Sequence, residues 1–163
     1  MTLQLPVTEM KAIALRLTPR QDLKAELTRL VDEQDWTAAC VLTCAGSLSQ
    51  ATMRFAGQPV GMCLKGYFEI LSLTGTLSKE GCHLHLAVAD KRGQTYGGHL
   101  LDGCHIYTTV ELVIGILPHL QFHRHVDDAT GFPELVISAA NSSPHAGILP
   151  QPPSPQPAVE AKE

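Results

Sequence analysis

One short segment of the chain, ADKRGQ, constrains the fold more than any other. Asp90 suits the first position of a type I turn, and Gly93 suits the left-handed position that ends a three-residue hairpin loop. The segment therefore predicts an antiparallel hairpin in which Asp90 pairs with Gln94. Counting outward from this turn places His85 directly opposite His99.

Alternation along the two predicted strands sorts their side chains onto two faces. The core face is expected to carry Leu84, Leu86, Val88, Tyr96 and Leu100. The other face carries His83, His85 and His99. Residues two apart on a strand lie about 7 Å apart, and directly opposed residues have Cβ atoms about 5 Å apart. Three imidazoles at those separations can converge on one ion, and Gly97 and Gly98 leave room beside them.

Neutral imidazole is a ligand for zinc, iron, nickel or copper, so the three histidines predict one divalent transition-metal ion, with Zn, Fe or Ni the leading candidates. Three protein ligands leave coordination positions open, as in catalytic zinc sites. The alternative interpretation is a polar face or a subunit contact. An enzyme would also need a proton-transfer group, and Glu69 and Glu111 are candidates only if their strands lie near this face.

The remaining histidines and the cysteines give weaker metal signals. His119, His123 and His125 flank a predicted strand, but their spacing alone is a poor motif. The five cysteines include no Cys-x-x-Cys pair, and the spacing of Cys40 and Cys44 does not suit zinc. We expect small core hydrophobes in a reduced, cytoplasmic protein, and the sequence has no window of about 18 apolar residues for a membrane span.

The rest of the chain is mostly strand by its pattern. Strands are expected at residues 11–17, 38–44, 67–78, 105–117 and 120–126. The run at 105–117 also fits a helix, but its density of β-branched residues favours a strand. The AGSLS segment that follows residue 44 is expected to end its strand in a turn.

One helix is expected over residues 18–34. Thr18 suits the N-cap, Pro19 the first helical position, and Gln21 the third position of a capping box. An apolar face then recurs at helical spacing, through Leu23, Leu27, Leu30 and Val31. The sum is an α+β (α/β) fold with a mainly antiparallel β-sheet flanked by few helices.

A change in composition divides the chain near residue 140. The predicted domain spans residues 8–140. Residues 144–163 hold six prolines in twenty positions, a density that forbids regular hydrogen-bonded structure, and they are expected to form a disordered tail.

The charge balance limits the partners that the domain can take. Sixteen acidic residues outnumber 12 basic ones, for a net charge of -4, and aromatic residues make up 5% of the chain. Such a chain supplies neither phosphate clamps nor stacking platforms for nucleic acid. We therefore expect direct DNA binding to be weak or absent.

Several segments, taken in order, resemble one known family, the PPC domain (plants and prokaryotes conserved, also written PCC). The matching segments are RLTPRQDL, VLTCAGSLSQATMRF, GYFEILSLTGTLS, HLHLAVAD, GGHL and YTTVELVIG. The resemblance runs from about Arg16 to Leu135. Arg20 stands where the family commonly has glycine, and Tyr67 stands where it has arginine.

The resemblance implies an α/β fold around an antiparallel sheet, assembled as a homotrimer. In plant members an AT-hook with an Arg-Gly-Arg-Pro core carries the DNA contact, and this chain has no such core. The plant domain itself mediates association with partners and with itself, and the positions that match here are Gly66, Phe68, Glu69, Ile70 and Leu71. Some prokaryotic members hold a metal on histidines that match His83, His85 and His99.

Two functional hypotheses follow. The first is a trimeric assembly or binding module linked to gene regulation. The alternative is a small metal-dependent enzyme that uses the three histidines.

Overall fold

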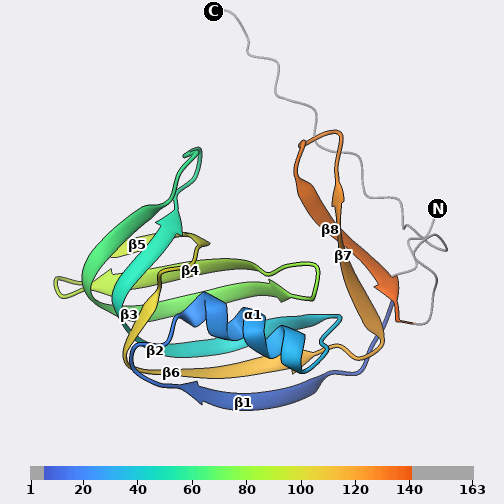
Figure 1. The fold of residues 1–163 in the computed structure, drawn as a ribbon, viewed down its shortest axis with the longest axis horizontal. Helices are drawn as coiled ribbons and strands as arrows, with labels where there is room; N and C mark the ends of the chain where they lie inside the picture. The colour runs from blue at the N-terminus through green and yellow to red at the C-terminus, as the bar shows by residue number, and fades with distance from the viewer. Residues whose placement is uncertain (1–5, 141–163) are drawn as a thin grey trace, which may run out of the picture.

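The structure, a computed structural model, describes residues 6–140 and consists mainly of strands (Figure 1). The strands are β1 (Lys11–Leu17), β2 (Ala39–Arg54), β3 (Met62–Leu77), β4 (His83–Asp90), β5 (Thr95–Leu100), β6 (His105–Ile116), β7 (Leu120–Val126) and β8 (Pro133–Ala139). Within residues 6–140 the one helix is α1 (Leu23–Glu33). The predicted fold class is therefore confirmed, while the proposed tail, 144–163, lies outside the described residues.

The strands form two antiparallel sheets. The larger has six strands in the order β1-β6-β2-β3-β4-β5, and the smaller pairs β7 with β8. Strand β5 also pairs with the end of β2, where Met53 lies opposite Leu100 and Arg54 lies opposite His99. Strands β2 to β5 therefore curl into a partly closed unit.

Gly98 makes this closure possible. A Cβ atom at Gly98 would lie 2.7 Å from the backbone oxygen of Arg54, closer than real Cβ contacts come. The expectation that Gly98 leaves room beside the histidines is therefore wrong. The missing side chain instead lets the backbones of β5 and β2 approach each other.

The main core lies between α1 and the six-stranded sheet, which the helix crosses in Figure 1. The helix buries Leu23, Leu27 and Val31. On the predicted core face of the β4–β5 hairpin, Leu84, Leu86, Val88 and Leu100 are buried there, all at most 2% exposed, while Tyr96 is only partly buried against this core. A second, small cluster of Ala38, Leu120 and Phe122 lies at the base of the β7–β8 hairpin.

The helix begins later than the sequence predicts. Asp22 is the N-cap, and its Oδ1 accepts hydrogen bonds from the backbone N–H groups of Lys24 and Ala25 at 3.0 and 3.1 Å. Arg20 has a φ of 75°, a left-handed conformation that a right-handed helix excludes. The predicted contact between Thr18 and Gln21 does form, with 2.6 Å between Thr18 N and Gln21 Oε1, but it closes a turn before the helix.

The predicted turn after residue 44 is also wrong. Strand β2 continues from Ala39 to Arg54 and absorbs the segment through register shifts against β6. Gly46 has a φ of 150°, and a Cβ there would collide with the backbone oxygen of Thr109 on β6. Glycine at position 46 therefore allows two strands to approach closely. In the sequence, a glycine of this kind cannot be told from a glycine in a turn.

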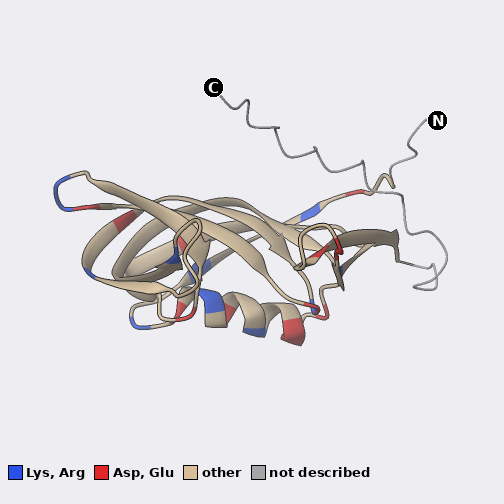
Figure 2. Ribbon diagram, turned by 90° about the horizontal axis from the view of Figure 1, so that it is seen from above, with Lys and Arg blue, Asp and Glu red and all other residues tan. Residues whose placement is uncertain are grey.

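Charged residues of both signs are interspersed on the surface. Figure 2 shows Lys and Arg next to Asp and Glu along α1, where Arg29 bridges Glu26 and Glu33. Over residues 6–140, no helix has the length and apolar character needed to cross a membrane.

Candidate metal centre

The hairpin that carries the histidines has the turn and register that the sequence predicts. The backbone N–H of Asp90 donates to the oxygen of Gln94 at 3.0 Å, and Gly93 has a φ of 78°. Asp90 Oδ1 also accepts from the N–H groups of Arg92 and Gln94. This local network fixes the pairing of β4 with β5, and His85 lies opposite His99.

The three histidines form a compact cluster on the outer face of the sheet. One ring nitrogen from each of His83, His85 and His99 lies within 4.8 Å of the other two. The Nε2 atoms of His83 and His85 are 3.2 Å apart. His83 and His85 are exposed and His99 is half-buried, so solvent reaches the cluster. Among residues 6–140, this is the one group of three or more His, Cys, Asp or Glu side chains with metal-ligand spacing.

The donor set fits a transition-metal ion. Two imidazoles bound tetrahedrally to zinc, at bond lengths of about 2.0–2.1 Å, have their nitrogens about 3.3 Å apart. The 3.2 Å separation of the His83 and His85 nitrogens matches that edge. The third nitrogen, from His99, lies within 4.8 Å of these two.

The surroundings favour the neutral, ligand-competent form of two of these imidazoles. Partial burial lowers the pKa of His83, and the nearby His85 and Arg124 lower it further. Partial burial likewise lowers the pKa of His99, with additional contributions from His83 and Arg54. Metal ligation requires neutral imidazole, so both shifts act in the direction that binding needs.

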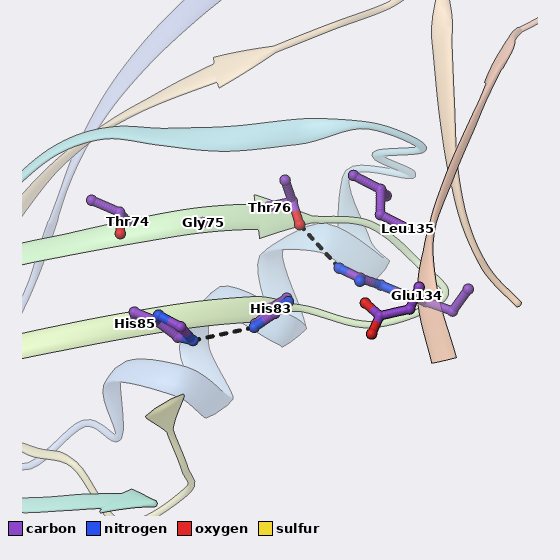
Figure 3. Close-up of a pocket in the computed structure, with 8 residues that line it drawn as sticks. Thr74, Gly75, Thr76, His83, His85, Glu134 and Leu135 are labelled. Carbon is purple, nitrogen blue, oxygen red and sulfur yellow. Dashed lines mark hydrogen bonds between the residues drawn. The ribbon is translucent and has the colours of Figure 1, made fainter. Parts of the chain in front are cut away.

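A pocket of about 270 Å³ opens beside His83 and His85 (Figure 3). Its floor is strand β3, where Thr76 pairs with His83 and Thr74 pairs with His85. Gly75 lies between these threonines, with a φ of 140°, and a Cβ there would collide with the backbone oxygen of His83. The glycine therefore holds the ligand-bearing strand close to β3.

The β7–β8 hairpin forms the far wall of this pocket. Arg124 from β7 and Glu134 from β8 line it, together with Leu135. The Arg124 guanidinium donates from Nη2 to Thr76 Oγ1 at 3.0 Å. Sequence reasoning missed both charged residues, because it did not predict β8 and gave no sign that β7 would reach the histidines.

Glu80, in the turn between β3 and β4, holds this hairpin in place. One carboxylate oxygen of Glu80 lies 2.6 Å from Nδ1 of His123, and the other accepts the backbone N–H of Arg124 at 2.9 Å. The opposite ring nitrogen of His123 lies 3.1 Å from Ser138 Oγ on β8. The role of His123 is therefore to connect the two sheets.

The other candidate residues lie elsewhere. Neither Glu69 nor Glu111 lines the histidine pocket. Glu69 pairs with Ala89 on β4, four residues along from His85, and Glu111 pairs with Arg16 on β1.

The five cysteines are unpaired, and the prediction that they are mainly core residues holds for only two of them, Cys44 and Cys104, which are buried. Burial raises the pKa of Cys44 to about 12 and that of Cys104 to about 11. At neutral pH both are protonated thiols that act as small apolar side chains. Cys63 differs, because it is exposed.

The proposed partner-binding segment on β3 is divided between surface and core. Phe68 and Ile70 are 6% and 7% exposed and belong to the main core. Gly66, Glu69 and Leu71 lie at the surface. A partner would meet only these outward residues and the exposed Tyr67 beside them.

Comparison with known proteins gives one family match. Residues 5–118 match the family model described as Plants and Prokaryotes Conserved (PCC) domain. The matched range includes all three histidines and ends before β7.

Three similar proteins extend this result. Bifunctional protein GlmU of Synechococcus sp. is 50% identical over 153 residues, which cover 94% of this chain and 24% of the relative. The chain thus spans about a quarter of the length of the curated relatives it matches. A solved hypothetical protein from Salmonella cholerae-suis is 43% identical with a TM-score of 0.81, over 83% of this chain and 98% of its own. A metal-containing protein from Archaeoglobus fulgidus is 28% identical with a TM-score of 0.69, over 81% of this chain and 99% of its own.

Proposed function

The chain belongs to the Plants and Prokaryotes Conserved (PCC) domain family, and on that premise we propose that it is a self-associating binding module whose histidine cluster holds one divalent transition-metal ion. The observation that carries the proposal is the convergence of three ring nitrogens within 4.8 Å of one another. The similarity to a protein named as metal-containing supports it. The five unpaired cysteines support action in a reducing cytoplasm.

In this proposal His83, His85 and His99 hold the ion. A bound zinc, iron or nickel ion would supply a Lewis acid with open coordination positions. Strand pairing fixes the backbone positions of the three histidines, since β4 pairs with β3 and β5 pairs with both β4 and β2.

Metal content is the direct test of this site. Protein purified without chelator and then offered zinc, iron or nickel should hold about one ion per chain by elemental analysis. His85→Ala should abolish binding without unfolding the domain, because His85 lies on the exposed face of its strand. His119→Ala, an exposed histidine outside the cluster, is the matched control. Equal metal contents in wild type and His85→Ala would refute the metal site.

The assembly part of the proposal is a homotrimer. Large apolar side chains are exposed on β3 and β6: Tyr67 is 63% exposed, Leu71 is 55% exposed and Tyr107 is 45% exposed. The rings of Tyr67 and Tyr107 contact each other across β2 in a tilted arrangement, with centroids 4.3 Å apart. Contact with further copies of this chain would bury these side chains, and the family resemblance supplies the number three.

Light scattering tests the assembly. Wild type should have three times the mass of one chain at micromolar concentration. Leu71→Arg should shift the distribution toward monomer, because a charge on an apolar contact costs desolvation. The control is Val126→Arg, since Val126 is 70% exposed on β7, which belongs to the smaller sheet and not to the sheet that carries the two tyrosines. A monomeric wild type would contradict the proposal.

Direct DNA binding is expected to be weak and salt-sensitive. The net charge is -4, and charges of both signs alternate along α1 (Figure 2). Proteins that bind duplex DNA tightly neutralise several phosphates with clustered Lys and Arg. Submicromolar, sequence-selective binding at physiological salt, measured by fluorescence anisotropy, would overturn this part of the proposal.

A further inference from the structure

We infer that the pocket beside the histidines is a subsite for a small monocarboxylate, which Arg124 binds while an oxygen of the same molecule reaches the metal. The inference rests on the proposed metal site and adds to it a ligand class. The pocket has a volume of about 270 Å³. Since one water takes about 30 Å³ of liquid, this volume corresponds to about nine waters, so a small ligand fits in it.

The first argument is the arrangement of polar groups around the pocket. Strand pairing places Thr74 beside His85 and Thr76 beside His83, so two hydroxyls accompany the imidazoles on one face of the sheet. Figure 3 shows Glu134 and Leu135 approaching from the β7–β8 hairpin on the other side. A molecule in the pocket therefore contacts both sheets at once.

The second argument is the orientation of Arg124. Its guanidinium is anchored to Thr76 Oγ1, and its backbone N–H is fixed by the carboxylate of Glu80. Over residues 6–140, the six ion pairs of the structure do not include Arg124. A guanidinium has five N–H donors in a planar fork that matches a carboxylate, and only one is used by Thr76. The remaining donors suit a ligand.

The third argument concerns ligand charge. Glu134 lines the same pocket and adds a negative charge beside Arg124. The Glu134 carboxylate accepts a hydrogen bond from the Thr130 hydroxyl. Over residues 6–140, the six ion pairs do not include Glu134. Like charges repel, so Glu134 makes the pocket less favourable for a dianion such as sulfate than the same pocket without Glu134, while the planar fork of Arg124 matches a carboxylate.

Cobalt-loaded protein allows a test that does not depend on any activity. The visible absorption of bound Co²⁺ changes when an added ligand enters its coordination shell, so acetate and sulfate can be titrated separately. Wild type should bind acetate more tightly than sulfate. Arg124→Gln should bind Co²⁺ as wild type does but acetate about tenfold more weakly or worse, the loss expected for a hydrogen-bonded charge pair. Glu134→Gln should improve sulfate binding.

Arg92→Gln is the matched control, because Arg92 is an exposed arginine in the β4–β5 turn. It should leave both titrations unchanged. If Arg124→Gln also changes Co²⁺ binding, Arg124→Lys is the variant to measure, since it keeps the positive charge and removes the planar guanidinium. Weaker acetate binding in Arg124→Lys then supports the subsite.

The outcomes separate the two proposals. Failure of wild type to bind Co²⁺ refutes the metal site on which the subsite depends. Normal Co²⁺ binding with equal acetate affinity in wild type and the Arg124 variants overturns the subsite alone.

Discussion

Hairpins β4–β5 and β7–β8 both face the histidine pocket, but different forces hold them. The first has a short turn stabilised by Asp90 and a face buried in the main core. The second has its own small apolar cluster and is tied to the larger sheet by the polar contacts of Glu80 and Arg124. The proposed metal ligands thus come from the firmly packed hairpin, and the proposed ligand contacts come from the more lightly attached one.

Core truncation should show this difference most strongly. Leu86→Ala removes a side chain that is 2% exposed in the main core, and it should lower the free energy of unfolding of the whole domain by about 2–5 kcal/mol. Phe122→Ala should mainly loosen β7 and β8, because Phe122 belongs to the small cluster. Chemical denaturation and hydrogen exchange measure the two effects. Equal loss of protection throughout the domain in Phe122→Ala would show that the hairpins are one cooperative unit.

A substitution at the β2–β5 closure should come next in size. In Gly98→Ala the new Cβ must displace the backbone of Arg54, so we expect a loss of about 1–3 kcal/mol and weaker metal binding through displacement of His99. Gly97→Ala is the neighbouring control, since its Cβ would meet its nearest atom at 3.4 Å. Thermal denaturation and metal titration of both variants provide the measurement. Identical behaviour of the two would argue against the close approach at Gly98.

The polar attachment of the second hairpin should have a smaller effect. Glu80→Gln removes the charge that accepts from Arg124 N–H and contacts His123, and we expect a loss of about 1–2 kcal/mol. Hydrogen exchange should quicken in β7 and β8, while metal content stays at the wild-type level. Glu9→Gln, at an exposed position before β1, is the control. Unchanged exchange in Glu80→Gln would mean that apolar contacts alone hold the hairpin.

The smallest effect is a pH dependence within the first hairpin. Because burial lowers the folded-state pKa of His83 and His99, both should protonate below the ordinary value of about 6.5 in metal-free protein. Their contribution to stability is then present above pH 6.5 and is lost as pH falls through the lowered folded-state pKa. Histidine ring NMR signals measure both titrations. A pKa at or above 6.5 for either residue would contradict the expected shift.

The same contrast explains what could be predicted from the sequence. The register that brings His85 opposite His99 is set by a turn a few residues away, so a local signal was sufficient. The contact of Glu80 with His123 joins residues 43 positions apart and leaves no local pattern. Arg124 resembles an ordinary surface arginine until β8 is known, and β8 begins at Pro133, a residue that strands accept at their first position but that gives no strand signal in the sequence.

Errors at the helix start and in β2 have a common cause. The segment before α1 has the residues of a capping box, but the left-handed conformation of Arg20 delays the helix to Asp22. The presence of Arg20 where the family commonly has glycine was the available signal. In β2, Gly46 suggested a turn because a close approach between strands and a turn both favour glycine.

The pairing of β5 with β2 also affects how the domain avoids aggregation. A strand at the border of a sheet offers unpaired backbone groups to any passing chain. The end of β5 pairs with Met53 and Arg54 of β2. The other border strand of the six-stranded sheet is β1. That strand carries exposed cationic residues near both ends, Lys11 and Arg16, which oppose the addition of a foreign strand. Gly98, which lets the backbones of β5 and β2 approach each other, thereby also removes one site from which cross-β growth could start.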